Sequence, residues 1–243
     1  MKHRLDSLLV LRNLAPTPEK ACALILAGQV LVGNHKADKP GQMVDETLAI
    51  TVKESSCPFV SRGGLKLAHG LAFFGIQPQG FICADIGAST GGFTDCLLQH
   101  GAAKVYAIDV GYGQLAWSLR QDKRVVVLER TNARHLTPAL IPEPIDLAVI
   151  DAAFISLKTL LPPILPLFAE QSVAILALIK PQFEVGRGES TAGVVTDPAL
   201  HDKVINDIST FSQGLGLTLH GVTPSPLLGP KGNTEFLTYL TRP

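Results

Sequence analysis

The stretch Cys83-Ala-Asp-Ile-Gly-Ala-Ser-Thr-Gly-Gly-Phe-Thr-Asp-Cys96 joins a short apolar run to a glycine-rich loop and the start of a helical pattern. Glycines at such a turn permit positive φ angles and let backbone N–H groups approach a ligand closely. Three residues separate Gly87 from Gly91, so the spacing differs from the G-x-G-x-x-G turn of dinucleotide-binding proteins. An acid directly before the glycines suits the cationic cofactor S-adenosylmethionine (SAM). The stretch therefore predicts a strand, a SAM-binding loop and a helix, with an ordinary tight turn as the alternative.

The same apolar run begins an alternation of strand and helix patterns that continues along the rest of the chain. Strands are expected at 81–85, 104–109, 125–129, 147–151, 173–179, 218–224 and 234–239, and helices at 93–100, 116–120, 157–167 and 201–215. A further helix is expected before the first strand, ending near Phe74. This alternation favours a doubly wound, mostly parallel α/β sheet, which binds ligands beyond the carboxyl ends of its strands.

The N-terminal part of the chain follows a different pattern. An amphipathic leucine run predicts a first helix near Leu5. Thr17-Pro18 then opens a second helix as N-cap and first helical residue, and Gly28 follows the end of that helix. Short strand patterns at 30–32 and 48–52 enclose a polar loop. Small helices and strands in so short a stretch predict a compact α+β module.

Length and composition limit the possible classes of protein. The 243 residues leave room for a small domain with its linker, expected at 1–60, and a larger α/β domain at 61–243. Lys and Arg total 21 and so do Asp and Glu, so net charge does not indicate a polyanionic partner. The four cysteines have neither C-x-x-C nor zinc-site spacing, and no metal site is expected. The first residues lack a signal-like apolar region, and prolines and polar residues interrupt the longest apolar run, 160–179. A cytoplasmic protein without a membrane segment is expected.

Polar side chains follow the expected strands at the edge where a cofactor would bind. Asp109 ends the second strand, where an acid can accept hydrogen bonds from both hydroxyls of a ribose. Asn132 follows the third strand, where a polar group can meet the adenine, although a simple turn residue is equally consistent with the pattern. The predicted cofactor-binding residues are Asp85, Gly87, Ala88, Ser89, Gly91, Gly92, Phe93, Asp109, Asn132 and Asp151.

Two lysines and two acids are expected to face the same pocket. Asp151 and Lys180 each end an apolar strand, and Pro181 turns the chain directly after the lysine. Lys66 follows a pair of glycines, and Glu235 stands at the start of the last strand. Each could be a surface charge by itself, since lysines also end strands to reach water. Together they predict a charged site at the edge of the sheet.

Six segments of the chain resemble the TlyA-type family, which is known both as hemolysin A and as FtsJ-like ribosomal RNA 2′-O-methyltransferases. The segments are Val60-Ser-Arg-Gly-Gly-Leu-Lys-Leu, Asp85-Ile-Gly-Ala-Ser-Thr-Gly-Gly-Phe-Thr-Asp, Asp109-Val-Gly-Tyr-Gly-Gln-Leu, Glu129-Arg-Thr-Asn-Ala-Arg, Phe154-Ile-Ser-Leu and Lys180-Pro-Gln-Phe-Glu. The resemblance covers nearly the whole chain. It implies a Rossmann-like SAM-dependent methyltransferase domain behind a small RNA-binding domain of the ribosomal-protein S-four type. It also implies a catalytic tetrad, which maps onto Lys66, Asp151, Lys180 and Glu235.

The residues and the resemblance together predict methyl transfer from SAM to a ribose 2′-hydroxyl, of a cytidine, in ribosomal RNA. Attack on the methyl group must be in line, so positioning of a poor nucleophile should dominate the catalysis. Lys180 is the expected general base, which requires its neutral amine. Two alternatives remain open: a membrane-active cytolysin, and a SAM- and RNA-binding ribosome assembly factor without turnover. The glycine spacing disfavours a nicotinamide dehydrogenase.

RNA contacts are expected from basic side chains in both domains, at Arg4, Lys20, Arg62, Arg187 and Lys231. The module at 1–60 carries seven basic side chains against six acidic ones, which is a weak charge excess for a polyanion. The glycine-rich stretch 186–193 predicts a mobile lid, or alternatively a merely disordered loop. The chain departs from the family pattern at Ala153, where a serine is expected before Phe154, and at the Thr17-Pro18 helix start, where a basic residue is frequent.

Overall fold

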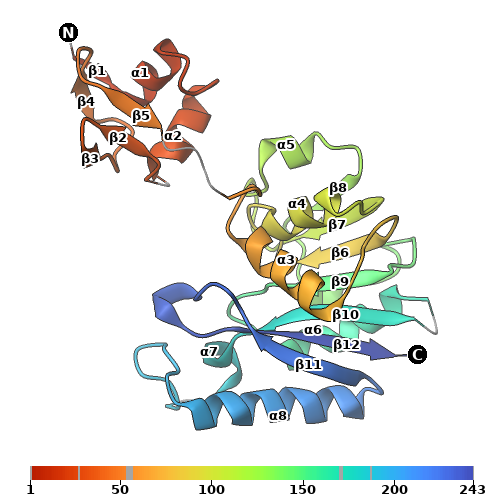
Figure 1. Cartoon of the computed structure of the whole chain (residues 1–243). Helices are drawn as coiled ribbons and strands as arrows, with labels where there is room; N and C mark the ends of the chain where they lie inside the picture. Colours follow the sequence, from red (N-terminus) through yellow and green to blue (C-terminus); the bar gives the residue numbers. More distant parts are fainter. Residues whose placement is uncertain (1, 27, 53–56, 170–171, 187, 243) are drawn as a thin grey trace. The chain divides into compact units, whose positions relative to one another are not determined.

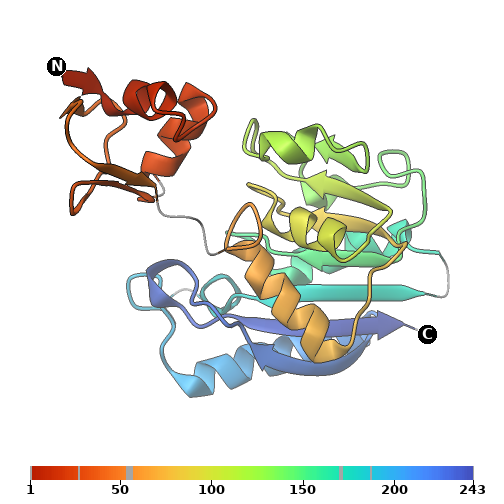
Figure 2. The same cartoon turned by 45° about the horizontal axis from the view of Figure 1, so that its top comes forward.

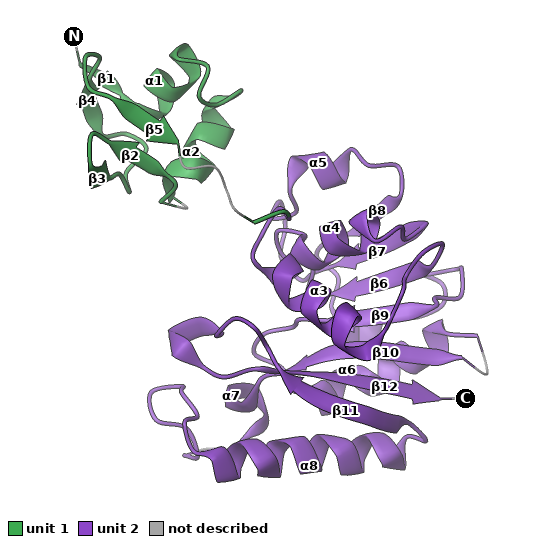
Figure 3. Ribbon diagram, viewed as in Figure 1, with its two compact units in different colours: residues 1–58 green, residues 59–243 purple. Residues whose placement is uncertain are grey.

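The protein forms two compact units, residues 1–58 and residues 59–243 (Figure 3). The computed structural model describes residues 2–26, 28–52, 57–169, 172–186 and 188–242 (Figure 1). Each unit has a hydrophobic core of its own. The units are described separately below.

Unit 1 is a small α+β domain whose helices pack on short antiparallel strands. Its elements are β1 (Lys2–Arg4), α1 (Leu5–Leu11), α2 (Pro18–Leu26), β2 (Val30–Val32), β3 (His35–Lys36), β4 (Met43–Asp45) and β5 (Ile50–Val52). β1 pairs with β4, and β2 pairs with both β3 and β5. The expected helix signals are present, since the Thr17 hydroxyl accepts a hydrogen bond from the Lys20 amide and Gly28 has a φ of +67°. The polar stretch after β2, which the sequence predicts as a loop, contains β3 and is followed by β4.

Unit 2 contains a seven-stranded mixed sheet in the order β11-β12-β10-β9-β6-β7-β8. The strands are β6 (Ile82–Ile86), β7 (Lys104–Ile108), β8 (Val125–Leu128), β9 (Leu147–Ile150), β10 (Val173–Ile179), β11 (Thr218–Pro224) and β12 (Phe236–Arg242). Neighbours from β8 to β10 are parallel, and β12 runs antiparallel to both β10 and β11. The sheet is therefore mostly parallel, as the sequence predicts.

Helices cover both faces of this sheet (Figure 2). The helical segments are α3 (Gly63–Phe74), α4 (Gly92–Gln99), α5 (Trp117–Arg120), η1 (Ala133–His135), α6 (Leu157–Ile164), η2 (Leu165–Leu167), α7 (Pro181–Glu184), α8 (Pro198–Gly214) and η3 (Pro230–Gly232). One core lies under α3, α4 and α5, and the other under η1, α6 and α8. Successive residues of a central strand such as β6 enter opposite cores. Cys83 enters the core under α3, α4 and α5, and Ala84 the other, which is the period-two pattern of a strand buried on both faces.

Several element boundaries differ from the expected ones by one to three residues, as in β12, expected at 234–239 and found at Phe236–Arg242. Two of the differences have a clear local reason. α8 begins three residues before the expected start, at Pro198, because the Asp197 side chain caps the helix by accepting from the amide of Ala199 (2.9 Å). The expected helix 157–167 ends as an α-helix at Ile164 and continues as the 3₁₀ segment η2. Prolines inside this segment remove backbone donors, which favours the change of helix type.

The strand register brings the ends of four parallel strands level with one another. Ile86 of β6 pairs with both Ile108 of β7 and Ile150 of β9, and Ile108 pairs with Leu128 of β8. The residues that directly follow these strands therefore meet at one edge of the sheet: Gly87, Asp109, Asp151 and Glu129. This edge contains the two cavities described next.

Candidate active site

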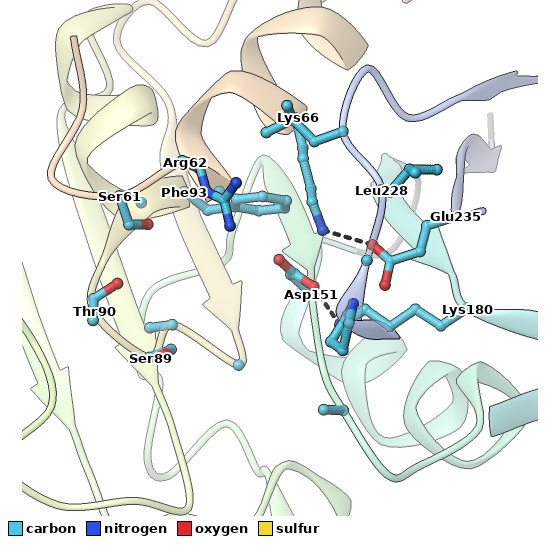
Figure 4. Close-up of a pocket in the computed structure, with 18 of the residues that line it drawn as sticks. Ser61, Arg62, Lys66, Ser89, Thr90, Phe93, Asp151, Lys180, Leu228 and Glu235 are labelled. Atoms are coloured by element: carbon cyan, nitrogen blue, oxygen red, sulfur yellow. Dashed lines mark hydrogen bonds and ion pairs between the residues drawn. The ribbon is translucent and has the colours of Figure 1, made fainter. Parts of the chain in front are cut away.

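Two adjoining cavities lie at the carboxyl edge of the sheet. The larger, of about 650 Å³, lies between the start of α3, the glycine loop, the ends of β9 and β10 and the segment before β12 (Figure 4). The smaller, of about 310 Å³, lies beyond the ends of β6, β7 and β9. Both are lined by Gly87, Ser89, Asp151 and Ala153, so the cavities communicate through the glycine loop and the end of β9.

The four charged residues of the predicted tetrad form two ion pairs in the larger cavity (Figure 4). The Nζ atom of Lys66, in the first turn of α3, lies 2.6 Å from Oε2 of Glu235. The Nζ atom of Lys180, directly after β10, lies 2.5 Å from Oδ1 of Asp151, directly after β9. All four side chains are largely or completely buried, so each charge is stabilised chiefly by its partner and not by water.

The glycine loop between β6 and α4 packs tightly against its neighbours. The amides of Gly87 and Ala88 both donate to the carbonyl of Ile108 (2.9 and 3.1 Å). Gly87 has a φ of +87°, and a Cβ there would lie 2.8 Å from the carbonyl oxygen of Asp151. Gly91 has a φ of +96°, and a Cβ there would overlap the side chain of Leu119. Glycine is thus required at both positions for the loop to reach this conformation.

The smaller cavity combines apolar walls with two polar side chains. Asp109 accepts hydrogen bonds from the amides of Ser89 (2.8 Å) and Gly111 (2.7 Å), one at each carboxylate oxygen. Each of these oxygens has a second lone pair for a further donor. Asn132 accepts from the amide of Arg134 (3.1 Å), which caps η1. A mostly apolar cavity with a fixed carboxylate in its wall is the kind of site that holds an adenosine group.

The structure does not bring every predicted cofactor residue to a cavity wall. Asp85 is completely buried beneath α4, and it lines neither cavity. It lies one residue before the end of β6, so strand alternation directs its side chain into the core. Its Oδ2 accepts a hydrogen bond from the hydroxyl of Thr94 (2.6 Å), and burial raises the pKa of Asp85 to about 7. Asp85 therefore supports the glycine loop from within the core, through its hydrogen bond to Thr94 of α4.

The predicted RNA-binding residues are dispersed over the molecule. Arg62 and Lys231 line the larger cavity, and the Lys231 ammonium donates to the carbonyl of Ala192 (2.8 Å). In unit 1, Lys20 is exposed on α2, whereas the Arg4 guanidinium forms an ion pair with Asp6 at 2.6 Å. Arg187 lies outside the described residues.

Sequence reasoning missed several residues at the rim of the site. Phe154 lies at the mouth of the smaller cavity with 90% of its surface exposed, a φ of +63°, and its ring 5.1 Å from that of Phe183. Leu228 is an exposed apolar residue lining the larger cavity. Large apolar side chains kept in solvent beside a charged cavity indicate a surface that contacts a partner. A segment containing Phe154 carried the family resemblance, but no periodic pattern could indicate its exposure.

Comparison with known proteins identifies the family. A model of FtsJ-like methyltransferases matches residues 59–242, and a model of the S4 domain matches residues 3–50. The chain belongs to the TlyA-type, FtsJ-like methyltransferase family. The 16S/23S rRNA (cytidine-2′-O)-methyltransferase TlyA of Mycobacterium tuberculosis is 50% identical over 239 residues, which cover 98% of this chain and 89% of the relative. Hemolysin A of Brachyspira hyodysenteriae is 40% identical, over 97% of this chain and 98% of the relative.

Solved structures agree with this placement in the FtsJ-like methyltransferase family. A Streptococcus thermophilus structure with a provisional hemolysin name is 40% identical, with a TM-score of 0.78 over 99% of this chain and 88% of that one. The magnesium protoporphyrin IX methyltransferase of Synechocystis, with bound SAH, has the same fold at 14% identity, with a TM-score of 0.51 over 75% of this chain and 84% of that one. The predicted fold, a Rossmann-like methyltransferase sheet behind a small S4 domain, is confirmed.

No helix in the described ranges is long and apolar enough to cross a membrane. Among the residues with defined positions, no group of three or more His, Cys, Asp or Glu side chains is arranged to hold a metal ion.

Proposed function

We propose that this protein transfers the methyl group of SAM to the 2′-hydroxyl of a cytidine in ribosomal RNA, in the cytoplasm where ribosomes are assembled. The observation that carries the proposal is the pair of buried lysine–carboxylate contacts in one cavity, directly beside a glycine loop and an adenosine-sized slot. The named activity of the Mycobacterium tuberculosis relative, at 50% identity, supports the same reaction.

The smaller cavity is the proposed place for the adenosine group of SAM. Its apolar walls suit a purine, and Asp109 presents two carboxylate oxygens to the ribose hydroxyls. Gly87 approaches the end of β9 so closely that it contributes only backbone to the wall that the two cavities share. SAM, when bound, supplies an electrophilic methyl group, and Asp151 at the shared wall faces the region between the cofactor and the RNA.

Lys180 is the proposed general base in the larger cavity. In its neutral form, Nζ of Lys180 would accept the proton of the 2′-hydroxyl. The ribose oxygen would then take the methyl group as the bond from methyl carbon to sulfur breaks, and the sulfur would leave as a neutral thioether. Asp151, 2.5 Å from Nζ of Lys180, fixes the direction in which the amine points. Lys66 and Glu235 form a second ion pair in the same cavity, beside the first (Figure 4). The buried charges keep both lysines in place before the substrate arrives, which suits a reaction that depends on positioning.

The surface around the cavities suits an unpaired RNA strand. Exposed apolar and cationic side chains line the two cavities: Val110, Phe154, Leu228, Arg62 and Lys231. Further exposed rings and a cation lie on the segments that follow β7 and β8: Tyr112, Trp117 and Arg130. Bases of unpaired RNA stack on aromatic rings, while phosphates bind the cations. The S4 domain at residues 3–50 supports an RNA substrate from the other unit.

Methyl transfer to ribosomal subunits from radiolabelled SAM tests the proposal. We expect RNA labelling by the wild type, and a fall in kcat of at least about a hundredfold in Lys180→Ala, because general base catalysis contributes on that order. The dissociation constant of SAM should remain unchanged, since Lys180 lies outside the adenosine slot. Lys158→Ala, on the exposed face of α6, is the matched control and should retain full activity. No labelling by the wild type, or undiminished labelling by Lys180→Ala, would contradict the proposal.

The hemolysin name of one relative supports membrane lysis as a second candidate. Leakage of dye from liposomes, measured with the same preparation, decides between the two. We expect no leakage at concentrations that methylate ribosomal RNA to completion. Leakage that persists in Lys180→Ala would establish a lytic activity independent of the methyltransferase site.

A further inference from the structure

The segment between β11 and β12 forms the wall of the larger cavity that faces the Lys66–Glu235 pair. Leu227, Leu228, Gly229, Pro230 and Lys231 all line the cavity. Gly229 lies so close to Glu235 that a Cβ on it would overlap the Oε1 atom of the glutamate. The carboxylate of Glu235, 1% exposed, is thus confined between the ammonium of Lys66 and the backbone of Gly229. The position of Gly229 therefore determines where this carboxylate can lie.

Asn233 holds this wall in place through both its backbone and its side chain. Its carbonyl accepts from the amide of Gly229 (2.8 Å), and its amide donates to the carbonyl of Pro230 (3.3 Å). Its side-chain Nδ2 donates to the same Pro230 carbonyl (2.9 Å) and also to the carbonyl of Gly193 (3.0 Å). The side-chain Oδ1 accepts from the amide of Val195 (3.0 Å). Asn233 is 2% exposed, so every side-chain polar group is used internally and none is left for solvent.

The partner of Asn233 is itself anchored to the main domain. The Val195 carbonyl hydrogen-bonds to Nε2 of His201 on α8 (2.9 Å), and Val195 is buried. Asp197, two residues later, caps the same helix. The segment 193–195 is consequently fixed to α8 on one side and to Asn233 on the other. The buried side-chain amide of Asn233 bonds both to segment 193–195 and to Pro230 in the cavity wall. It therefore restricts the motion of this wall relative to α8.

We propose that Asn233 is a positioning residue for methyl transfer, which fixes the carboxylate of Glu235 by locking the Gly229 wall to α8. Asn233 does not reach the cavity itself and acts through Gly229 and Glu235. The inference rests on the proposed function, since it assigns to Asn233 a role in the reaction of that site. A displaced Glu235 would move Lys66, and with it one side of the cavity that receives the ribose.

The variant Asn233→Asp tests the role with almost no change of shape. It replaces Nδ2 by an oxygen, which removes the hydrogen bonds to the carbonyls of Gly193 and Pro230. The new oxygen then faces two carbonyl oxygens of like partial charge. We expect kcat to fall by about tenfold to a hundredfold, the loss that a small displacement of reacting groups causes. The dissociation constant of SAM should stay within about twofold of the wild type, because the smaller cavity is untouched. Asn206→Asp, exposed on α8, makes the same chemical change and should leave kcat unchanged.

A second variant separates positioning from folding. Gly229→Ala places a methyl group against Oε1 of Glu235 while Asn233 keeps its bonds, and kcat should fall similarly. The double variant should be no slower than the slower single variant, because both act on one group. Hydrogen exchange should accelerate at the amides of Val195 and Gly229 in Asn233→Asp, and remain as in the wild type in Asn206→Asp.

The outcomes distinguish this inference from the proposed function. An active wild type together with undiminished kcat in Asn233→Asp, at an unchanged or lowered unfolding midpoint, would overturn the inference alone. Fully additive losses in the double variant would also overturn it. An inactive wild type would overturn the proposed function and the inference with it, whereas accelerated exchange would still establish the hydrogen bonds of Asn233 as the link between the wall and α8.

Discussion

The carboxyl group of Asp85 is enclosed between β6 and α4, and its Oδ2 accepts a hydrogen bond from the Thr94 hydroxyl. Loss of hydration is the largest cause of its raised pKa, of about 7, and the nearby charges of Asp151 and Asp109 raise it further. The side chain therefore binds a proton in the neutral range, directly beneath the glycine loop. The protonation of this acid therefore changes in the neutral range, well above the range near 3.8 where an ordinary aspartate titrates.

Asp85→Asn should flatten the dependence of stability on pH. Below the ordinary value of 3.8, folded and unfolded chains both carry the proton. Between 3.8 and about 7 only the folded chain retains it, so this group lowers the free energy of unfolding as pH rises, and the full cost is present above 7. Thermal unfolding from pH 4.5 to 8 measures the effect. The midpoint difference, variant minus wild type, should increase by several degrees up to about pH 7 and then level off.

The exposed residue Asp207 provides the control for this measurement. Asp207→Asn, on α8, should leave a nearly constant midpoint difference over the same range, because its carboxyl remains in contact with water. A constant difference for Asp85→Asn as well would show that Asp85 is ionised throughout in the folded protein.

The sequence could predict that the four charged residues of the tetrad share one cavity, although their catalytic roles stay a prediction. Lys66 lies in the first turn of α3, and Glu235 directly precedes β12. Asp151 and Lys180 directly end apolar strands, and parallel strands end at a common edge. Asp85 has the same apparent position, but the strand extends one residue further, to Ile86. Asp85 therefore lies within the strand, and its side chain points into the core under one face of the sheet instead of beyond the strand end. The role inferred for Asn233 had no sequence signal, since its hydrogen-bond partners lie some forty residues away and only the fold brings them together.

The loop between β7 and α5, together with the first residue of α5, forms an exposed aromatic surface next to the site. Trp117 is 74% exposed and Tyr112 69% exposed, and the Arg130 guanidinium lies 4.2 Å from the centre of the Tyr112 ring. The loop is connected to the site, because the Ala116 amide donates to the carbonyl of Thr90 (3.1 Å), a residue lining the larger cavity. An exposed ring with a cation across it presents both a stacking face and a charge for a nucleotide.

Replacement of these rings should weaken RNA binding without affecting SAM. We expect Trp117→Ala and Tyr112→Ala each to raise the KM for ribosomal subunits by about fivefold to a hundredfold, because stacking of one base contributes about 1–3 kcal/mol. Equilibrium binding of SAM should be unchanged. Phe73→Ala, an exposed ring on α3 that lines neither cavity, is the matched control. Equal KM values for wild type, Trp117→Ala and Tyr112→Ala would exclude this loop from the RNA-binding surface.

Element boundaries were predictable where long buried patterns exist and not where elements are short. The range 173–179 was predicted without error for β10, which is a continuous apolar strand buried on both faces. In unit 1, β1, β3 and β4 are only two or three residues long, so alternation cannot be recognised in them. These strands exist because tertiary pairing supplies the backbone partners that their sequences do not specify.

The chain as a whole carries no net charge, although its proposed substrate is a polyanion. Affinity for RNA must therefore come from the arrangement of cations and from stacking, and not from the total charge. Carboxylates neutralise several unit 2 cations, as in the ion pairs Lys104–Glu143, Lys158–Asp207 and Lys203–Glu189. In unit 1, Lys20, Lys36 and Lys39 have exposed side chains within the S4 domain. The exposed unit 1 lysines can therefore bind phosphate, whereas the unit 2 lysines in these ion pairs already have a carboxylate partner.

Removal of the exposed unit 1 lysines should lower the affinity for ribosomal subunits and its salt dependence together. Each phosphate contact that is lost should reduce the slope of log K against log salt by about 0.7–0.9. The triple variant Lys20→Gln, Lys36→Gln, Lys39→Gln should therefore bind subunits more weakly at low salt and approach the wild type at high salt, with kcat at saturating RNA unchanged. The matched triple variant Lys104→Gln, Lys158→Gln, Lys203→Gln removes the same charge from paired positions and should keep the wild-type slope. If the unit 1 variant also keeps the wild-type slope, unit 2, with its exposed rings and Arg130, binds the RNA without the S4 domain.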